Sequence, residues 1–141
     1  MTSPEYPIMP DRAWRTAAAF WEAVDAEELR FPQCSTCGRF VWYPLPRCPS
    51  CRTKTLEWVP VEPRGEVYSW TAVHRAFLPE LASQLPVTVV IAQFDTAPDI
   101  RLITGLADGH QSGAVEVGVP LRIVFPPVHG EHRMPLALLE V

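Results

Sequence analysis

The features that this 141-residue sequence lacks limit its chemistry. Lys54 is the only lysine, so a Schiff-base mechanism would depend on one residue in a basic stretch that we expect to be solvated. The sequence contains no GxSxG nucleophile elbow, no Walker loop and no GxGxxG run, each of which would indicate a specific kind of active site. We therefore expect no enzyme-like activity from the isolated chain.

Long apolar runs are also missing. No run approaches the roughly 20 residues that cross a bilayer, and the region after Met1 lacks the basic-then-apolar pattern of a signal peptide. The sixteen prolines cut the chain into pieces that suit strands and loops better than long helices. We expect a soluble, cytoplasmic protein that has no membrane partner.

The four cysteines of the chain form two CxxC pairs, Cys34 with Cys37 and Cys48 with Cys51. Each pair places two thiolates on one tight turn, and ten residues between the pairs let the chain double back. This spacing predicts a tetrahedral site for Zn²⁺, or less often iron. Four thiolates leave no open position for substrate or water, so we expect a structural metal and no nucleophilic cysteine. The metal spacing also favours a reducing compartment.

Charge is unevenly distributed along the chain. The net charge is −4, yet the segment from Arg30 to Thr55 carries five basic and no acidic residues, which leaves about −9 on the remainder. This balance argues against a general nucleic-acid binder. The basic segment could meet phosphates of a nucleotide or of coenzyme A, or it could compensate the charge of four thiolates around a dication. The sequence leaves both interpretations open.

Residues 1–28 form the first of three expected segments. The stretch after Pro10 predicts a helix capped by Asp11, with aromatic residues at helical spacing. Trp14, Phe20 and Trp21 could pack on the rest of the chain, or they could anchor a partner at an interface.

Residues 29–60 form the metal-binding ribbon, and residues 61–141 form a β domain. A ribbon of this size buries too little surface to fold alone, so metal binding should stabilise it. Five strand-like stretches follow Pro63, with Gly65 and Gly105 where a strand could bend. This count favours a five-stranded OB-fold barrel, although an SH3-like barrel would give a similar pattern. The fold class is therefore mainly β with an N-terminal helix. Short helical turns could form in FLPELASQL and in SGAVEVGVP.

Several residues could bind a ligand. His74 lies at the expected end of the first barrel strand, where it could hydrogen-bond a carbonyl of a ligand or serve in proton transfer, or could be a half-buried barrel histidine. Arg64 and Arg75 lie at the junction of ribbon and barrel, and their guanidinium groups suit phosphate pairing. Arg39, Arg47 and Arg52 on the ribbon are further candidates. His129 and His132 have a spacing that could hold a metal, but a polar loop explains them as well.

The ordered set of motifs resembles the DUF35 family. The resemblance lies in the aromatic-rich helix, CxxCG followed by CPxC, the stretch GEVYSWTAVHR, and the glycine–apolar–proline step before LRIVF, and it covers residues 13–125. It implies a rubredoxin-like zinc ribbon joined to an OB-fold. Leu45 lies between two prolines where relatives often show a Pro-Pro pair, and this departure concerns no metal ligand.

The resemblance also implies a role beside acyl-CoA enzymes. Similar proteins form complexes with thiolase-fold, lipid-transfer-protein-like enzymes, including acyl-CoA thiolases that supply a synthase and steroid side-chain aldolases, while others accompany hotdog-fold hydratases. The expected function is that of a non-catalytic subunit that organises such a complex and helps to bind the coenzyme A thioester as a shared ligand. A dimeric partner would give a heterotetramer.

Two other functions compete with this one. OB-folds and zinc ribbons can both bind single-stranded nucleic acid, although the acidic barrel makes nucleic acid an unfavoured partner. An electron carrier with iron at the four thiolates would be coloured, whereas a zinc protein is colourless.

Overall fold

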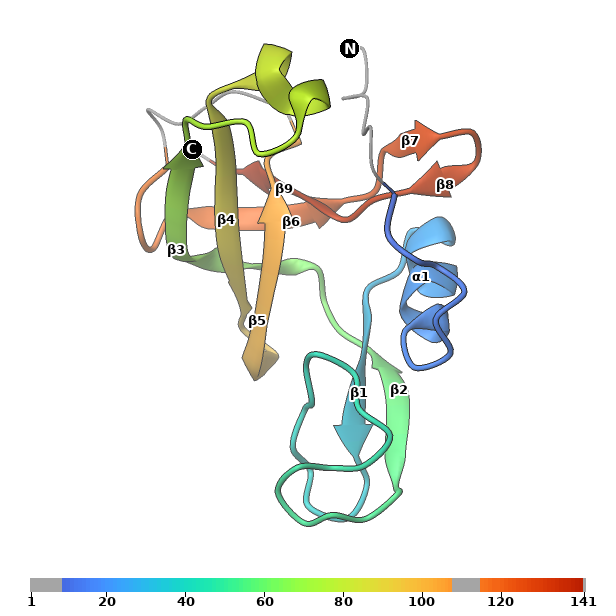
Figure 1. Ribbon diagram of the computed structural model, residues 1–141. Coiled ribbons are helices and arrows are strands. Elements are labelled where there is room, and N and C mark those ends of the chain that lie inside the picture. The colour runs from blue at the N-terminus through green and yellow to red at the C-terminus, as the bar shows by residue number, and fades with distance from the viewer. Residues whose placement is uncertain (1–8, 108–114, 141) are drawn as a thin grey trace.

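The computed structural model describes residues 9–107 and 115–140. Within these residues it contains one α-helix, one short 3-10 helix and nine strands (Figure 1). The helices are α1 (Ala18–Asp25) and η1 (Pro79–Gln84), and the strands are β1 (Arg30–Cys34), β2 (Leu56–Pro60), β3 (Arg64–Val73), β4 (Val87–Phe94), β5 (Ala97–Gly105), β6 (Pro120–Val124), β7 (Pro127–His129), β8 (His132–Arg133) and β9 (Leu136–Leu139).

Strands β1 and β2 form the antiparallel hairpin of the ribbon, with Cys34 paired to Leu56 and Arg30 paired to Pro60. The long connection between them carries both cysteine pairs and folds back against β1 through a bridge between Gln33 and Phe40. In Figure 1 the ribbon extends downward from the rest of the chain, and α1 lies beside its upper end. The ribbon thus holds its cysteines at one end and meets the helix at the other.

The remaining long strands form a five-stranded antiparallel sheet in the order β5-β4-β3-β6-β9. A parallel bridge between Leu106 and Ala137 connects its two edges, and the Ala107 N–H donates to the Ala137 carbonyl at 2.8 Å. This is the closure of a small OB-type barrel. The predicted fold class is confirmed, with the ribbon ahead of the barrel.

Gly65 is required by the close approach of two barrel strands. It pairs with Phe94 on β4, and a Cβ atom at this position would lie 1.8 Å from the Gln93 carbonyl oxygen. Only glycine fits such a backbone contact. The structure thus gives Gly65 a role in strand packing.

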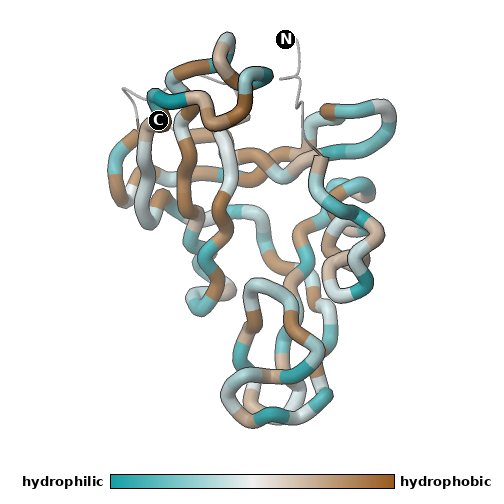
Figure 2. Tube along the Cα trace, viewed as in Figure 1, coloured by the Kyte–Doolittle hydropathy of each residue, from teal (hydrophilic) through white to brown (hydrophobic). Residues whose placement is uncertain are grey.

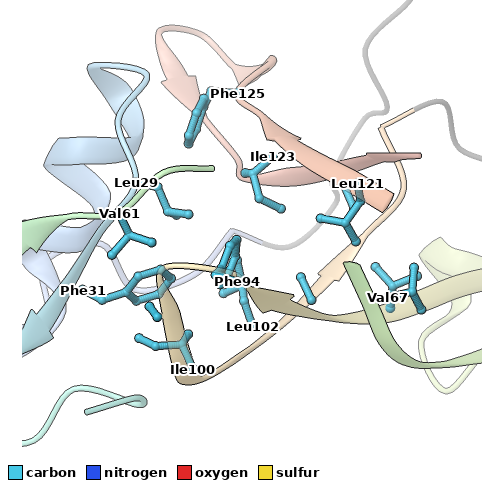
Figure 3. Packing of buried hydrophobic residues seen from close by; sticks show 14 of the residues in the cluster. Leu29, Phe31, Val61, Val67, Phe94, Ile100, Leu102, Leu121, Ile123 and Phe125 are labelled. Carbon is cyan, nitrogen blue, oxygen red and sulfur yellow. The ribbon is translucent and has the colours of Figure 1, made fainter. Parts of the chain in front are cut away.

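One hydrophobic core joins the helix, the ribbon and the barrel (Figure 3). Phe31 of β1 is fully buried at its centre. Its ring centroid lies 6.0 Å from that of Phe20 in α1, 5.0 Å from that of Trp42 in the ribbon, and 5.7 Å from that of Phe94 in β4. Figure 2 shows the corresponding apolar stretches in the strands, while the far end of the ribbon is mostly polar. The helix therefore covers a core that it shares with both other segments.

The helix is shorter than the sequence predicts, and Asp11 does not cap it. The α-helix begins at Ala18, after Ala17, which makes no side-chain cap. Asp11 instead accepts a hydrogen bond at 3.0 Å from the Ala13 N–H, two residues further on. This local Asx-type bond closes a separate turn and competes with helix initiation.

The two expected helical turns have different outcomes. The stretch FLPELASQL contains η1, whereas SGAVEVGVP lies partly outside the described residues and has no helix in its described part, from Val115 onward. No described helix has the length and apolar character needed to cross a membrane.

Candidate functional site: a cysteine cluster and an aromatic groove

The four cysteine sulfurs lie within 4.8 Å of one another at the end of the ribbon. Both CxxC turns have the same backbone. The Gly38 N–H donates to the Cys34 carbonyl at 2.8 Å, and the Arg52 N–H donates to the Cys48 carbonyl at 2.9 Å. Gly38 and Arg52 also both adopt positive φ, at 78° and 62°. The two turns are therefore a matched pair, although only the first has the glycine that favours this conformation.

Threonine hydroxyls support the cysteine sulfurs. The Thr55 and Thr53 hydroxyl oxygens lie 3.4 Å and 3.5 Å from Cys34 Sγ, and Thr53 lies 3.0 Å from Cys51 Sγ. Hydrogen bonds from Thr55, from the Cys37 N–H and from Thr53 lower the pKa of Cys34 to about 5. The thiolate of Cys34, the form that a metal requires, is therefore favoured at neutral pH. A backbone hydrogen bond from Arg39 lowers the pKa of Cys37, but burial and the three other cysteines raise it further, to about 11.

This donor set fits a structural zinc ion. Sulfur ligands suit zinc, and four of them complete a tetrahedral shell. Cys34 and Cys48 are buried, while Cys37 is exposed and Cys51 is intermediate. Such a centre holds the ribbon together and offers no position for a reacting substrate.

A hollow of about 660 Å³ lies between the barrel and the aromatic residues of the helix and ribbon. One wall consists of Phe20 and Trp21 of α1 with Trp42 and Tyr43 of the ribbon loop. The opposite wall comes from β4, from β5, including Ile103, and from the segment that leads into β9. We call this hollow the aromatic groove. A second hollow, of about 440 Å³, shares the four aromatic residues and extends to Trp14.

The aromatic groove is apolar and contains little that can ionise. Tyr43 is the only residue with an ionisable side chain among those that line it, and no Lys, Arg, His, Asp or Glu of the described residues does so. Thr104, in the groove wall, donates its hydroxyl to the Pro135 carbonyl at 2.6 Å. Trp42 Nε1 is buried without a hydrogen-bond partner among the described residues. The groove can therefore hold an apolar group.

A polar cluster joins two sides of the aromatic groove. Asp25, at the end of α1, forms an ion pair with Arg12, accepts the Arg133 N–H at 3.0 Å, and lies 3.3 Å from His132 Nδ1. Burial opposes ionisation of Asp25, but the hydrogen bonds from Arg133, Arg12 and His132 outweigh it, so the pKa of Asp25 lies below its usual value. The cluster therefore fastens the helix to the β7–β8 hairpin, and the ionised form of Asp25 is favoured.

Two family models match the sequence. Residues 21–57 match the rubredoxin-like zinc ribbon domain of ChsH2, and residues 58–126 match the C-terminal OB-fold domain of ChsH2. Comparison with curated proteins gave no match.

Two solved structures have the same fold. A chain of a structure described as the Ltp2-ChsH2(DUF35) aldolase is 25% identical, with a TM-score of 0.78 over 96% of this chain and 100% of that one. A DUF35 protein of unknown function from Sulfolobus solfataricus is 16% identical, with a TM-score of 0.60 over 90% of this chain and 87% of that one. The present chain belongs to the DUF35 family.

The cationic and histidine candidates of this DUF35 chain, among them His74, Arg64 and Arg75, do not line the aromatic groove. His74 is exposed, so the interpretation of a half-buried barrel histidine is wrong, because β3 ends at Val73 and leaves His74 in the following loop. Arg64 begins β3 beside the ribbon and lies 3.3 Å from Glu140. The placement of Arg75 at the same junction is wrong, because Arg75 follows the other end of this ten-residue strand; its guanidinium lies 5.5 Å from the Phe77 ring centre.

The remaining basic and histidine residues also have other neighbours. Arg39 donates to the Ser50 hydroxyl, and Arg47 donates to the Arg52 carbonyl. His129 and His132 face each other in the β7–β8 hairpin, where His132 contacts Asp25. These contacts favour the polar-loop interpretation of the two histidines.

The three aromatic residues expected at a partner interface have different environments. Trp14 is 53% exposed and Phe20 is 3% exposed, while Trp21 is partly buried against the core. Phe20 therefore belongs to the core, because its ring packs against Trp42 at 4.8 Å and against Phe31. An interface role stays a prediction for Trp14 and Trp21.

The barrel side of the aromatic groove was not predicted from the sequence. The stretch PVTVVIAQFD could have indicated it, because as a strand this stretch has apolar residues on both of its faces. An antiparallel strand usually has one polar face when that face meets water. In the structure Val87 and Val89 of this stretch line the groove.

Proposed function

We propose that this protein is a non-catalytic subunit of an aldolase complex that acts on acyl-CoA thioesters. The observation that carries the proposal is the match of nearly the whole chain to a chain of the Ltp2-ChsH2(DUF35) aldolase. The match covers the ribbon, the helix and the barrel together, so the likeness is not confined to a common small fold. The partner in this proposal is a thiolase-fold enzyme that supplies the reacting side chains.

The chemistry of the described residues supports an accessory role. The four cysteines are grouped for a metal, and Lys54 is exposed near the last of them. The aromatic groove has no carboxylate, imidazole or ammonium group among its described lining residues. Cleavage of a carbon–carbon bond needs a group that moves a proton and a group that stabilises the developing charge. In this proposal both belong to the partner.

The zinc ribbon has a positioning role in this proposal. Four thiolates would hold Zn²⁺, which closes the loop that carries Trp42 and Tyr43. That loop packs on Phe20 and Phe31 of the shared core. The metal therefore keeps the aromatic wall in place beside the barrel and takes no part in the reaction.

If the two subunits share the thioester, coenzyme A would contact exposed polar side chains at one of the two ends of β3, Arg64 at its start or His74 and Arg75 after its end. Arg64, His74 and Arg75 are exposed, and arginine forks suit phosphate groups. Charge reversal at Arg64 and Arg75 should weaken turnover of a CoA thioester by the complex. Charge reversal at Arg15, which is exposed and lies outside the barrel, is the control.

The test is affinity purification of the tagged protein from its host, followed by identification and quantification of co-eluting proteins. A stoichiometric thiolase-fold partner is expected. Turnover of acyl-CoA substrates should be absent from the isolated chain and present in the complex. Enzyme-like turnover by the isolated chain, or its recovery alone under conditions that keep complexes intact, would contradict the proposal.

A further inference from the structure

The position of the aromatic groove in the barrel indicates a ligand site. OB-folds bind their ligands on the face of the second and third strands, between the loop after the first strand and the loop before the last. In this chain those strands are β4 and β5, and both line the groove. The two loops contribute Gln84 on one side and Met134 and Pro135 on the other. The groove therefore lies where this barrel architecture normally receives a ligand.

The size of the groove fits a small molecule. Its volume is about 660 Å³, and small-molecule sites occupy roughly 300–1,000 Å³. Its walls come from the helix, the ribbon and the barrel, which share one core. The Asp25 cluster connects the helix to the hairpin ahead of β9, so two of these walls are tied together without a ligand.

The lining of the groove selects the chemical class of the ligand. No cationic side chain of the described residues lines it, and the nearby Arg12 is paired with Asp25 and lies over the Trp21 ring. Phosphates need cations or free N–H groups, so the phosphate-bearing end of a nucleotide does not belong here. Aromatic rings opposite Ile103 and Val89 instead favour hydrocarbon, whose burial needs no polar partner.

We propose that the aromatic groove binds the hydrocarbon part of an acyl group, and that the carrier of the acyl group remains outside it. This inference rests on the proposed function for the identity of the ligand as the acyl part of a thioester. The affinity of the groove then depends on the length and bulk of the acyl group. The subunit contributes substrate preference to the complex, while the partner performs the chemistry.

The test is calorimetric titration of the zinc-loaded full chain with hexanoate, octanoate and decanoate, each below its micelle concentration. Saturable binding is expected, and each additional buried methylene should tighten binding by up to about fourfold, which corresponds to about 0.8 kcal/mol. Coenzyme A without an acyl group should not compete with decanoate.

Two pairs of matched variants locate the binding. Ile103 lines the groove and is 52% exposed, so Ile103→Asp should fold normally, and the exposed Val117 permits the same change outside the groove. Ile103→Asp should weaken decanoate binding by about tenfold or more, because the charge must be desolvated, whereas Val117→Asp should leave it unchanged. Tyr43→Ala should also weaken binding, and Tyr68→Ala, at a residue of similar exposure outside the groove, should not.

The outcomes separate this inference from the proposed function. Failure of the wild-type chain to bind any of the three carboxylates, or equal binding by Ile103→Asp and Val117→Asp, would overturn the inference even if the complex forms and is active. A third outcome is that the wild type binds no carboxylate and that Ile103→Asp no longer forms the complex. This outcome would identify the groove as a protein interface and would also overturn the inference. Acyl binding without any thiolase-fold partner would leave the groove site established and the proposed function wrong.

Discussion

At the scale of single residues, Gly65 makes the sharpest prediction because its role is purely steric. A Cβ atom there would lie 1.8 Å from the Gln93 carbonyl oxygen, so Gly65→Ala must push β3 away from β4. The free energy of unfolding should fall by about 1–3 kcal/mol or more, measured by urea denaturation. Thr71→Ala, at an exposed position on the same strand, should change it by less than about 0.5 kcal/mol. Equal stability of the two variants would show that the strands can separate freely.

At the scale of elements, the ribbon depends on its metal. Cys34→Ser or Cys48→Ser removes one of the four grouped thiolates, and the ribbon is too small to fold on its remaining contacts. The zinc content should fall from about one ion per chain to near zero, and the Trp emission should shift to longer wavelength as Trp42 leaves the core. Ser50 lies within the second CxxC turn, and its hydroxyl contacts Arg39, so Ser50→Ala should retain the metal. Full zinc content in both cysteine variants would refute the assignment of the site.

The contact between α1 and the β7–β8 hairpin has its own test. Asp25→Asn weakens the ion pair and hydrogen bonds that join the two elements, and because the site is partly solvated we expect a loss of about 1 kcal/mol near neutral pH. The experiment compares the urea stability of wild type and variant as a function of pH. The exposed Asp99 provides a control, Asp99→Asn, that removes the same charge.

The pH dependence follows from the lowered pKa of Asp25. The folded protein binds this proton less tightly than the unfolded chain does, so the contribution of Asp25 is complete above the unfolded value of about 3.9 and is lost as the pH falls through the lower, folded value. The stability difference between wild type and Asp25→Asn should therefore shrink as the pH falls below about 4, where Asp25 takes up its proton. A difference that grows as the pH falls below about 4 would contradict the lowered pKa of Asp25.

At the scale of the whole molecule, the shared core predicts that helix, ribbon and barrel unfold together. Phe31 is fully buried and contacts all three. Phe31→Ala should cost about 3–5 kcal/mol, and calorimetry should show one transition for wild type and variant alike. Phe77→Ala, at a ring that is 78% exposed, should change the stability by less than about 0.5 kcal/mol. Two separate transitions in the wild type would mean that residues 29–60 and 61–141 fold independently.

The sequence by itself determined the fold class and the grouping of the cysteines, because both depend on local spacing. Each CxxC turn brings its two cysteine sulfurs together. Alternating apolar residues indicate a strand whichever neighbouring strand it pairs with. The order of the motifs along the sequence also indicated the DUF35 family. Composition also limits a lysine-dependent mechanism to Lys54, because composition does not depend on folding.

Only the tertiary structure decided where the functional surfaces lie. Residues that are far apart in the chain, such as Trp42 and Ile103, line one groove because the ribbon and the helix close over β4 and β5. The same packing placed Phe20 in the core and left His74 exposed, and a local turn at Asp11 displaced the start of the helix. Periodicity indicates which face of an element is apolar, but it does not indicate which other element covers that face. That choice depends on long-range packing, and it is what separates a buried core residue from the wall of a binding site.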